Sequence, residues 1–71
     1  MIEAAGDPYG FGSNLGRFLC RVNDDLSPDE ISQAVRDFVE VMNTDLDMDD
    51  SEQREQLFLG VGFGYAIEKQ S

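Results

Sequence analysis

The chain has 71 residues, with fifteen acids, five bases and no histidine, which give a formal net charge of −10. A chain of this length makes one small domain, residues 1–71, that buries only about 60% of its unfolded surface. The single cysteine excludes an internal disulfide, and the lack of histidine excludes nucleophile–base pairs built on histidine and zinc sites of the Cys/His kind. We therefore expect a non-enzymatic protein that carries no cofactor.

The composition also bears on location and on the classes of partner. The glycine-rich start contains acids and lacks the basic residues of a signal peptide, so we expect none. The longest uncharged run, residues 56–67, is shorter than the roughly 20 residues that a membrane span needs. We expect a soluble cytoplasmic protein that binds neither nucleic acid nor anionic lipid directly, since both would repel its charge.

Residues 1–12 predict an irregular leader, because glycines, an aspartate and a proline of the kind found in turns dominate this stretch. Tyr9 and Phe11 are expected to anchor the leader on the core. Ser13 or Asn14 then predicts the start of a first helix over residues 13–23. Its apolar residues recur at helical spacing, and they are Leu15, Phe18, Leu19 and Val22.

The second helix, predicted over residues 28–44, has the clearest start signal. Ser27 is a favourable N-cap, Pro28 fits the first helical position, and Glu30 completes a capping box with Ser27. One apolar stripe follows, made of Ile31, Val35, Phe38, Val39 and Met42. Acids such as Asp29, Asp37 and Glu40 lie on the opposite face.

A third helix is predicted over residues 51–68, after an acidic connector at residues 45–50, with Asp50 or Ser51 as its cap. Within it, large apolar residues alternate with glycine and alanine, which is also the period of a strand. Each glycine inside a helix costs about 1 kcal/mol relative to alanine. We predict an all-α three-helix bundle with an irregular leader, and the alternative is an α+β fold with residues 58–67 as a strand.

Several small or buried residues have more than one interpretation. Gly60 and Gly64 share one helical face, where they allow either close packing within one chain or self-association of two copies as a homodimer. Cys20 is expected to be a partly buried apolar residue, although nearby Arg17 and Arg21 could lower the pKa of its thiol. We expect these two arginines to pair with acids and to hold the second helix onto the first. The predicted core comprises Leu15, Phe18, Leu19, Val22, Ile31, Val35, Phe38, Met42, Phe58, Val61 and Tyr65.

The acidic connector locally resembles the calcium loop of EF-hand proteins. Asp45, Asp47 and Asp49 stand at loop positions one, three and five, and the resemblance implies that they would be the ligands of a weak calcium site. The chain departs from the family twice. Asp50 replaces the glycine of the sharp turn, and Gln56 replaces the closing bidentate glutamate. The more economical interpretation is a solvated turn that caps a helix.

Charge segregation is the main functional signal. Residues 23–55 hold twelve acids and two bases, whereas the flanks are neutral. Such a field favours a positively charged partner or ion, and the alternative is that the acids only maintain solubility or reflect a high-salt habitat. In type, though in no shared motif, the chain resembles phage-encoded inhibitors such as anti-CRISPR and other DNA-mimic proteins. This resemblance implies a protein-binding module whose acidic face occupies the basic nucleic-acid site of its target. The expected contact residues are Asp29, Asp37, Glu40, Asp45, Asp47, Asp49 and Asp50. Two alternatives are a structural or assembly subunit that self-associates through its apolar third helix, and a degenerate EF-hand-like calcium module.

Overall fold

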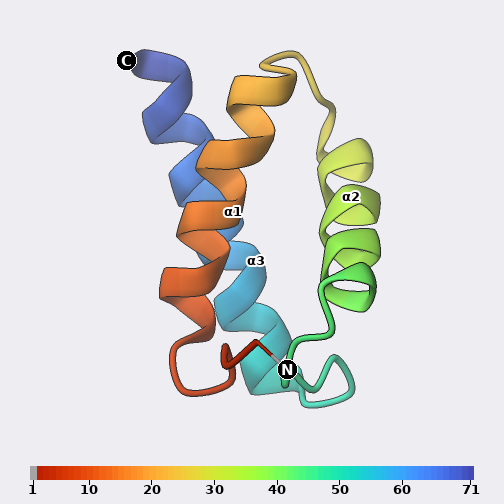
Figure 1. Ribbon diagram of the computed structural model, residues 1–71. Helices are drawn as coiled ribbons and strands as arrows, with labels where there is room; N and C mark the ends of the chain where they lie inside the picture. Colours follow the sequence, from red (N-terminus) through yellow and green to blue (C-terminus); the bar gives the residue numbers. More distant parts are fainter. Residues whose placement is uncertain (1) are drawn as a thin grey trace.

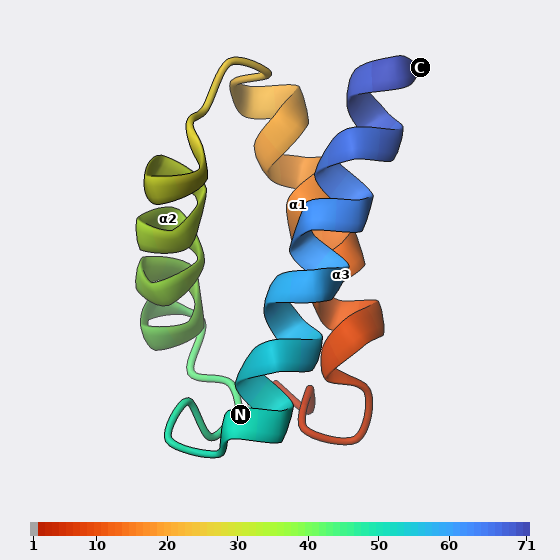
Figure 2. The same cartoon turned by 180° about the vertical axis from the view of Figure 1, so that it is seen from behind.

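The computed structural model describes residues 2–71, which form three α-helices and no strand. These are α1 (Pro8–Val22), α2 (Pro28–Val41) and α3 (Ser51–Gln70). Helices α1 and α3 lie side by side and α2 stands beside this pair, as both views show (Figure 1 and Figure 2). The predicted three-helix bundle is confirmed, and the alternative of a strand over residues 58–67 is wrong.

Helix α1 begins five residues earlier than predicted, so residues 8–12 of the expected irregular leader are helical. Asp7 is the N-cap, and its carboxylate accepts a hydrogen bond from the backbone N–H of Gly10 at 3.0 Å. Pro8 occupies the first turn, where its missing N–H costs nothing. Tyr9 and Phe11 are therefore helical residues. Phe11 packs against the core as expected, whereas Tyr9 is exposed. Of the leader glycines that suggest turns in the sequence, Gly12 is used in packing against α3.

Four glycines bring the backbones of α1 and α3 into direct contact. A Cβ added to Gly12 or Gly16 would collide with the carbonyl oxygen of Leu57 or Val61 on α3. Reciprocally, a Cβ on Gly60 or Gly64 would collide with the carbonyl oxygen of Tyr9 or Ser13 on α1. Only a residue without a side chain allows this approach. The expectation that Gly60 and Gly64 permit close packing within the chain is confirmed, and a self-association face on α3 would have to use other residues.

The two remaining helices start where the sequence predicts. Ser27 and Glu30 form the capping box of α2, and Asp50 caps α3 by accepting hydrogen bonds from the backbone N–H groups of Glu52 and Gln53. Helix α2 ends at Val41, three residues before the prediction, because Asn43 adopts a left-handed φ of 52°. Asparagine tolerates that conformation better than most residues do.

Backbone and side-chain hydrogen bonds connect the segments outside the helices. Ile2 pairs with the chain after α2, donating its N–H to the carbonyl of Asn43 and accepting from the N–H of Asp45, both at 3.0 Å. The buried hydroxyl of Tyr65 on α3 donates to the carbonyl of Asn23 at 2.7 Å and accepts from the N–H of Leu26 at 2.9 Å. The turn between α1 and α2 is therefore tied to α3.

The core lies along the α1–α3 contact and extends to the inner face of α2. The predicted members Leu15, Leu19, Val35, Val61 and Tyr65 are buried, and Ile31, Phe38, Met42 and Phe58 are partly buried. Phe18 and Val22 were expected in the core but are exposed. The neighbouring helix α2 covers Phe18 only on one side, through an edge-to-face contact with Phe38. The structure instead buries Ala4, Cys20, Val39 and Leu57.

Candidate functional site

The acidic surface is defined here as the seven expected contact residues, of which three lie on α2 and four lie in the connector before α3. All are exposed except Asp45, which is half-buried. They fall into two groups according to whether the carboxylate accepts hydrogen bonds from the backbone. In the first group it accepts no backbone hydrogen bond within residues 2–71 and caps no helix; the members are Asp29, Asp37, Glu40 and Asp49.

The other three carboxylates shape the backbone. Asp45 accepts from the N–H groups of Ala4 at 2.5 Å and Ala5 at 2.8 Å, which attaches the N-terminal segment to the connector. Asp47 accepts from the N–H of Asp49 at 3.0 Å, and Asp50 caps α3. Hydrogen bonds from the backbone N–H of Ala4, which has the larger effect, and of Ala5 lower the pKa of the Asp45 carboxyl, because both bonds favour its charged form. Substitution of these three residues would disturb the fold as well as the charge.

The structure does not bring the three calcium-ligand candidates together. Asp45 points to the N-terminal segment, whereas Asp47 bonds within its own turn. Within residues 2–71 no three acidic or cysteine side chains converge as metal ligands would. The solvated turn that caps a helix is the interpretation that the geometry fits.

The bases do not neutralise the acidic surface. Arg17 and Arg21 both face Glu68 on α3, with closest N–O distances of 3.9 Å and 2.6 Å. Hydrogen bonding to Glu68 raises the pKa of the Arg21 guanidinium. The expectation that these arginines hold α2 onto α1 is therefore wrong, since they join α1 to α3. Glu68, which the sequence interpretation left without a role, is the only carboxylate in an ion pair among the described residues.

The two bases inside the acidic segment, Arg36 and Arg54, form no ion pair within residues 2–71. Arg36 lies over the ring of Phe58, with its guanidinium carbon 5.7 Å from the ring centroid. Arg54 donates to the backbone carbonyl of Met48 at 3.0 Å. The contact of Arg36 therefore links α2 to α3, and that of Arg54 links α3 to the connector before it. As a result, none of the twelve acids in residues 23–55 is in an ion pair within residues 2–71.

Cys20 is buried in the core, and burial raises the pKa of its thiol, with the charges of Asp24 and Glu68 adding to the effect. The suggestion that Arg17 and Arg21 lower this pKa is wrong, because both arginines are engaged by Glu68. The thiol is an apolar packing group in this position, and burial is deeper than the sequence suggests.

A second exposed feature is an apolar stripe on α3. Leu59, Phe63 and Ile67 are spaced by four residues and are 54%, 50% and 37% exposed. Tyr9 of α1 packs beside Phe63 with ring centroids 6.0 Å apart. The three stripe residues belong to the run in which large apolar residues alternate with glycine and alanine, the pattern that suggested a strand in the sequence. It remains on the surface because the intervening small residues form the contact with α1.

Comparison of the chain with protein-family models, with curated proteins and with solved structures found no match in any of the three. None of the helices formed by residues 2–71 combines the length and the apolarity of a membrane span. The functional argument therefore rests on the chemistry of the surface.

Proposed function

We propose that this chain is a non-enzymatic protein-binding module whose acidic surface engages a basic surface of a partner protein. The observation that carries the proposal is the unpaired state of the acids of residues 23–55 within the described structure. A field that is not neutralised internally attracts an oppositely charged partner and speeds its association. The partner class that we propose is a nucleic-acid-binding protein, whose basic groove the chain would occupy as an inhibitor of the DNA-mimic type.

The spacing of the acids supports this choice of partner. Asp37 and Glu40 are three residues apart on α2, so they are separated by about 4.5 Å along the helix axis. Phosphates along one nucleic-acid strand are about 3.4 Å apart along the duplex axis. A groove lined by arginines and lysines for such a strand could therefore pair with successive carboxylates of α2. The connector continues the acidic run beyond the end of the helix.

The test is a pull-down with a variant whose charge reversal spares the fold. In Asp37→Lys/Glu40→Lys, both substituted residues are exposed and neither caps a helix. The matched control is Asp24→Lys/Asp25→Lys in the turn before α2. Each pair of reversals changes the net charge from −10 to −6. The two variants thus differ only in where the charge is removed.

We expect wild type and control to retain the same basic protein from lysate at about 0.05 M salt, and the α2 variant to lose it. Retention should disappear at about 0.5 M salt, where the Debye length falls to roughly 4 Å. The captured protein is then tested with a fluorescent DNA or RNA duplex. Displacement of that duplex by wild type, but not by the α2 variant, is the expected result. Equal retention by all three proteins, or no displacement, would sink the proposal.

The apolar stripe of α3 favours a second candidate, a structural or assembly subunit that self-associates. Leu59, Phe63 and Ile67 leave about half of their side-chain surface in water, and pairing of two stripes would bury it. The net charge of −10 opposes this association at low salt. Light scattering at about 1 M salt, where charges are screened, should show a dimer of wild type and a monomer of Phe63→Ser. A monomer of wild type under these conditions removes this candidate.

A further inference from the structure

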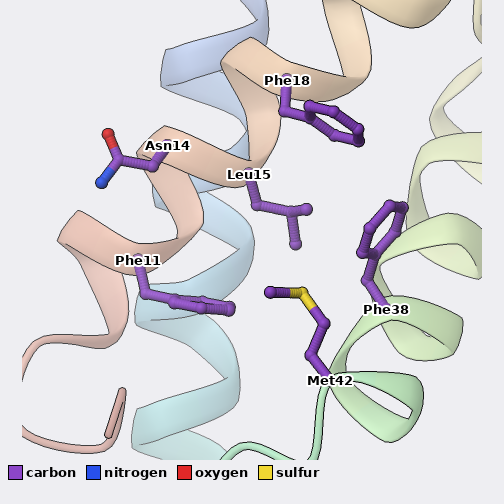
Figure 3. A pocket seen from close by; sticks show the side chains of 6 residues that line it. All are labelled: Phe11, Asn14, Leu15, Phe18, Phe38 and Met42. Atoms are coloured by element: carbon purple, nitrogen blue, oxygen red, sulfur yellow. The ribbon is translucent and has the colours of Figure 1, made fainter. Parts of the chain in front are cut away.

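An apolar groove separates α1 from α2 on the face shown in Figure 3. Phe11, Leu15 and Phe18 extend from α1 toward Phe38 and Met42 of α2, whereas the amide of Asn14 points away from them. The cavity between these side chains has a volume of about 340 Å³. It arises because the glycine contacts draw α1 toward α3 and leave α2 connected to α1 mainly through its side chains.

The walls of the groove are held in place although they face solvent. The rings of Phe18 and Phe38 meet edge to face, with centroids 5.5 Å apart and planes at 79°. Phe18 nevertheless remains 48% exposed. A smaller apolar depression lies beside Phe38 on α2, lined by that ring, by Val41, which is 82% exposed, and by Asp37. The two depressions share Phe38, so the apolar surface continues across α2.

The dimensions of the groove suit a helix. Phe11 and Phe18 are seven residues apart on α1, which corresponds to about 10 Å along the axis, or two helical turns. A partner helix laid along the groove could place apolar side chains at positions i, i+4 and i+7 between these rings. This is the arrangement by which amphipathic helices bind hydrophobic grooves in other proteins.

Charge selects among the occupants of such a groove. A second copy of the chain would bring another net charge of −10 to the same surface, and an anionic membrane would be repelled for the same reason. On α2, Asp37 borders the apolar surface, and Glu30 lies seven residues earlier on the same helix face. On the α1 side, Arg17 and Arg21 are engaged by Glu68. The charge left to meet a partner beside the groove is therefore negative.

We propose that the groove between α1 and α2 binds a basic amphipathic helix of the partner protein, with apolar residues packed against Phe11, Phe18 and Phe38 and basic residues facing the acids of α2. The inference rests on the proposed function, because it names the element of the basic partner that the acidic module recognises. Binding by charge alone would not depend on the order of the partner's residues, whereas binding in the groove requires that its apolar residues lie on one helix face.

Two synthetic peptides separate the requirements. Each has about 18 residues of lysine, leucine and phenylalanine; one places the apolar residues at positions i, i+4 and i+7, and the other scrambles the same composition. Fluorescence anisotropy should give a dissociation constant at least about tenfold lower for the amphipathic peptide. Phe18→Ala should raise the dissociation constant of the amphipathic peptide about tenfold, because an anchoring contact is lost. The matched control is Phe63→Ala on α3, because its ring is equally exposed at 50% and it should bind like wild type. Circular dichroism checks that both variants are folded.

The outcomes distinguish the two proposals. Equal binding of both peptides, or no effect of Phe18→Ala in the folded variant, would overturn the groove and leave the acidic surface standing. Failure of both peptides to bind at low salt would overturn the proposed function as well.

NMR spectra recorded without peptide provide a further check. If signals of the groove residues shift with protein concentration alone, a second copy occupies the groove. If they shift with millimolar benzyl alcohol while the amphipathic peptide does not bind, the groove serves a small apolar molecule. Either result would overturn the proposed helix.

Discussion

Replacement of Gly64 by alanine tests the backbone contact that organises the fold. Gly64 is buried in α3, and its added Cβ would collide with the carbonyl oxygen of Ser13, a backbone atom that no rotamer change can move. Overpacking typically costs about 1–3 kcal/mol, and a rigid backbone neighbour points to the upper end of that range. The higher helix propensity of alanine returns about 1 kcal/mol. The net effect should be a loss of about 2 kcal/mol in the free energy of unfolding.

The sequence contains a matched control two residues away. Gly62 lies in the same helix, is exposed, and a Cβ there would meet nothing within 4 Å. Gly62→Ala should therefore raise the free energy of unfolding by about 1 kcal/mol through helix propensity alone. Thermal unfolding followed by circular dichroism should resolve both changes, because 1 kcal/mol shifts the midpoint of a domain of this size by about 4–8 °C. The reasoning is refuted if Gly64→Ala is as stable as wild type or unfolds at the same temperature as Gly62→Ala.

Three further predictions concern single side chains. Tyr65→Phe removes two hydrogen bonds from a buried hydroxyl, so urea unfolding should show a loss of about 1–3 kcal/mol, and exchange of the Leu26 amide proton should accelerate. The folded pKa of Asp45 is lowered, so its contribution to stability is present above the unfolded pKa of about 3.9 and is lost as the pH falls through the folded value. The urea midpoint of Asp45→Asn should therefore lie below that of wild type at neutral pH, and the gap should narrow in acid; a gap independent of pH would contradict the assignment. Burial and the raised pKa of the Cys20 thiol should make its reaction with iodoacetamide much slower in the native protein than in urea, and equal rates would show that the thiol is accessible.

Local signals in the sequence predicted the starts of two helices because capping involves residues three positions apart. Ser27 and Glu30 form their box in the structure, and Asp50 caps α3. The same local reasoning failed at Asp7 and Pro8, where the glycines that follow indicate turns more strongly than the cap indicates a helix. Each glycine disfavours a helix by about 1 kcal/mol, and nothing within residues 1–12 reveals that Gly12 contacts α3.

For the candidate site, too, the sequence predicted one part and only the fold revealed the rest. The sequence identified the acids, but it did not distinguish carboxylates that hold the backbone, such as Asp45, from those that only carry charge, such as Glu40. That distinction depends on which distant N–H groups the fold brings within reach. Phe18 and Phe38 were predicted as core residues from their helical spacing. Spacing specifies a face of a helix, and only the position of the neighbouring helix determines whether that face is covered.

The sequence by itself determined the charge field and the caps of α2 and α3 and favoured the helical class, because composition and contacts over three or four residues are enough for each. Tertiary structure alone decided that Gly12, Gly16, Gly60 and Gly64 join two helices by their backbones. It also decided that α2 stands apart, with an apolar groove beside it, and that within residues 2–71 no base forms an ion pair with its acids. The physical reason is that α1 packs closely against α3 on one side and not against α2, and this packing depends on residues 45 to 51 positions apart in the chain.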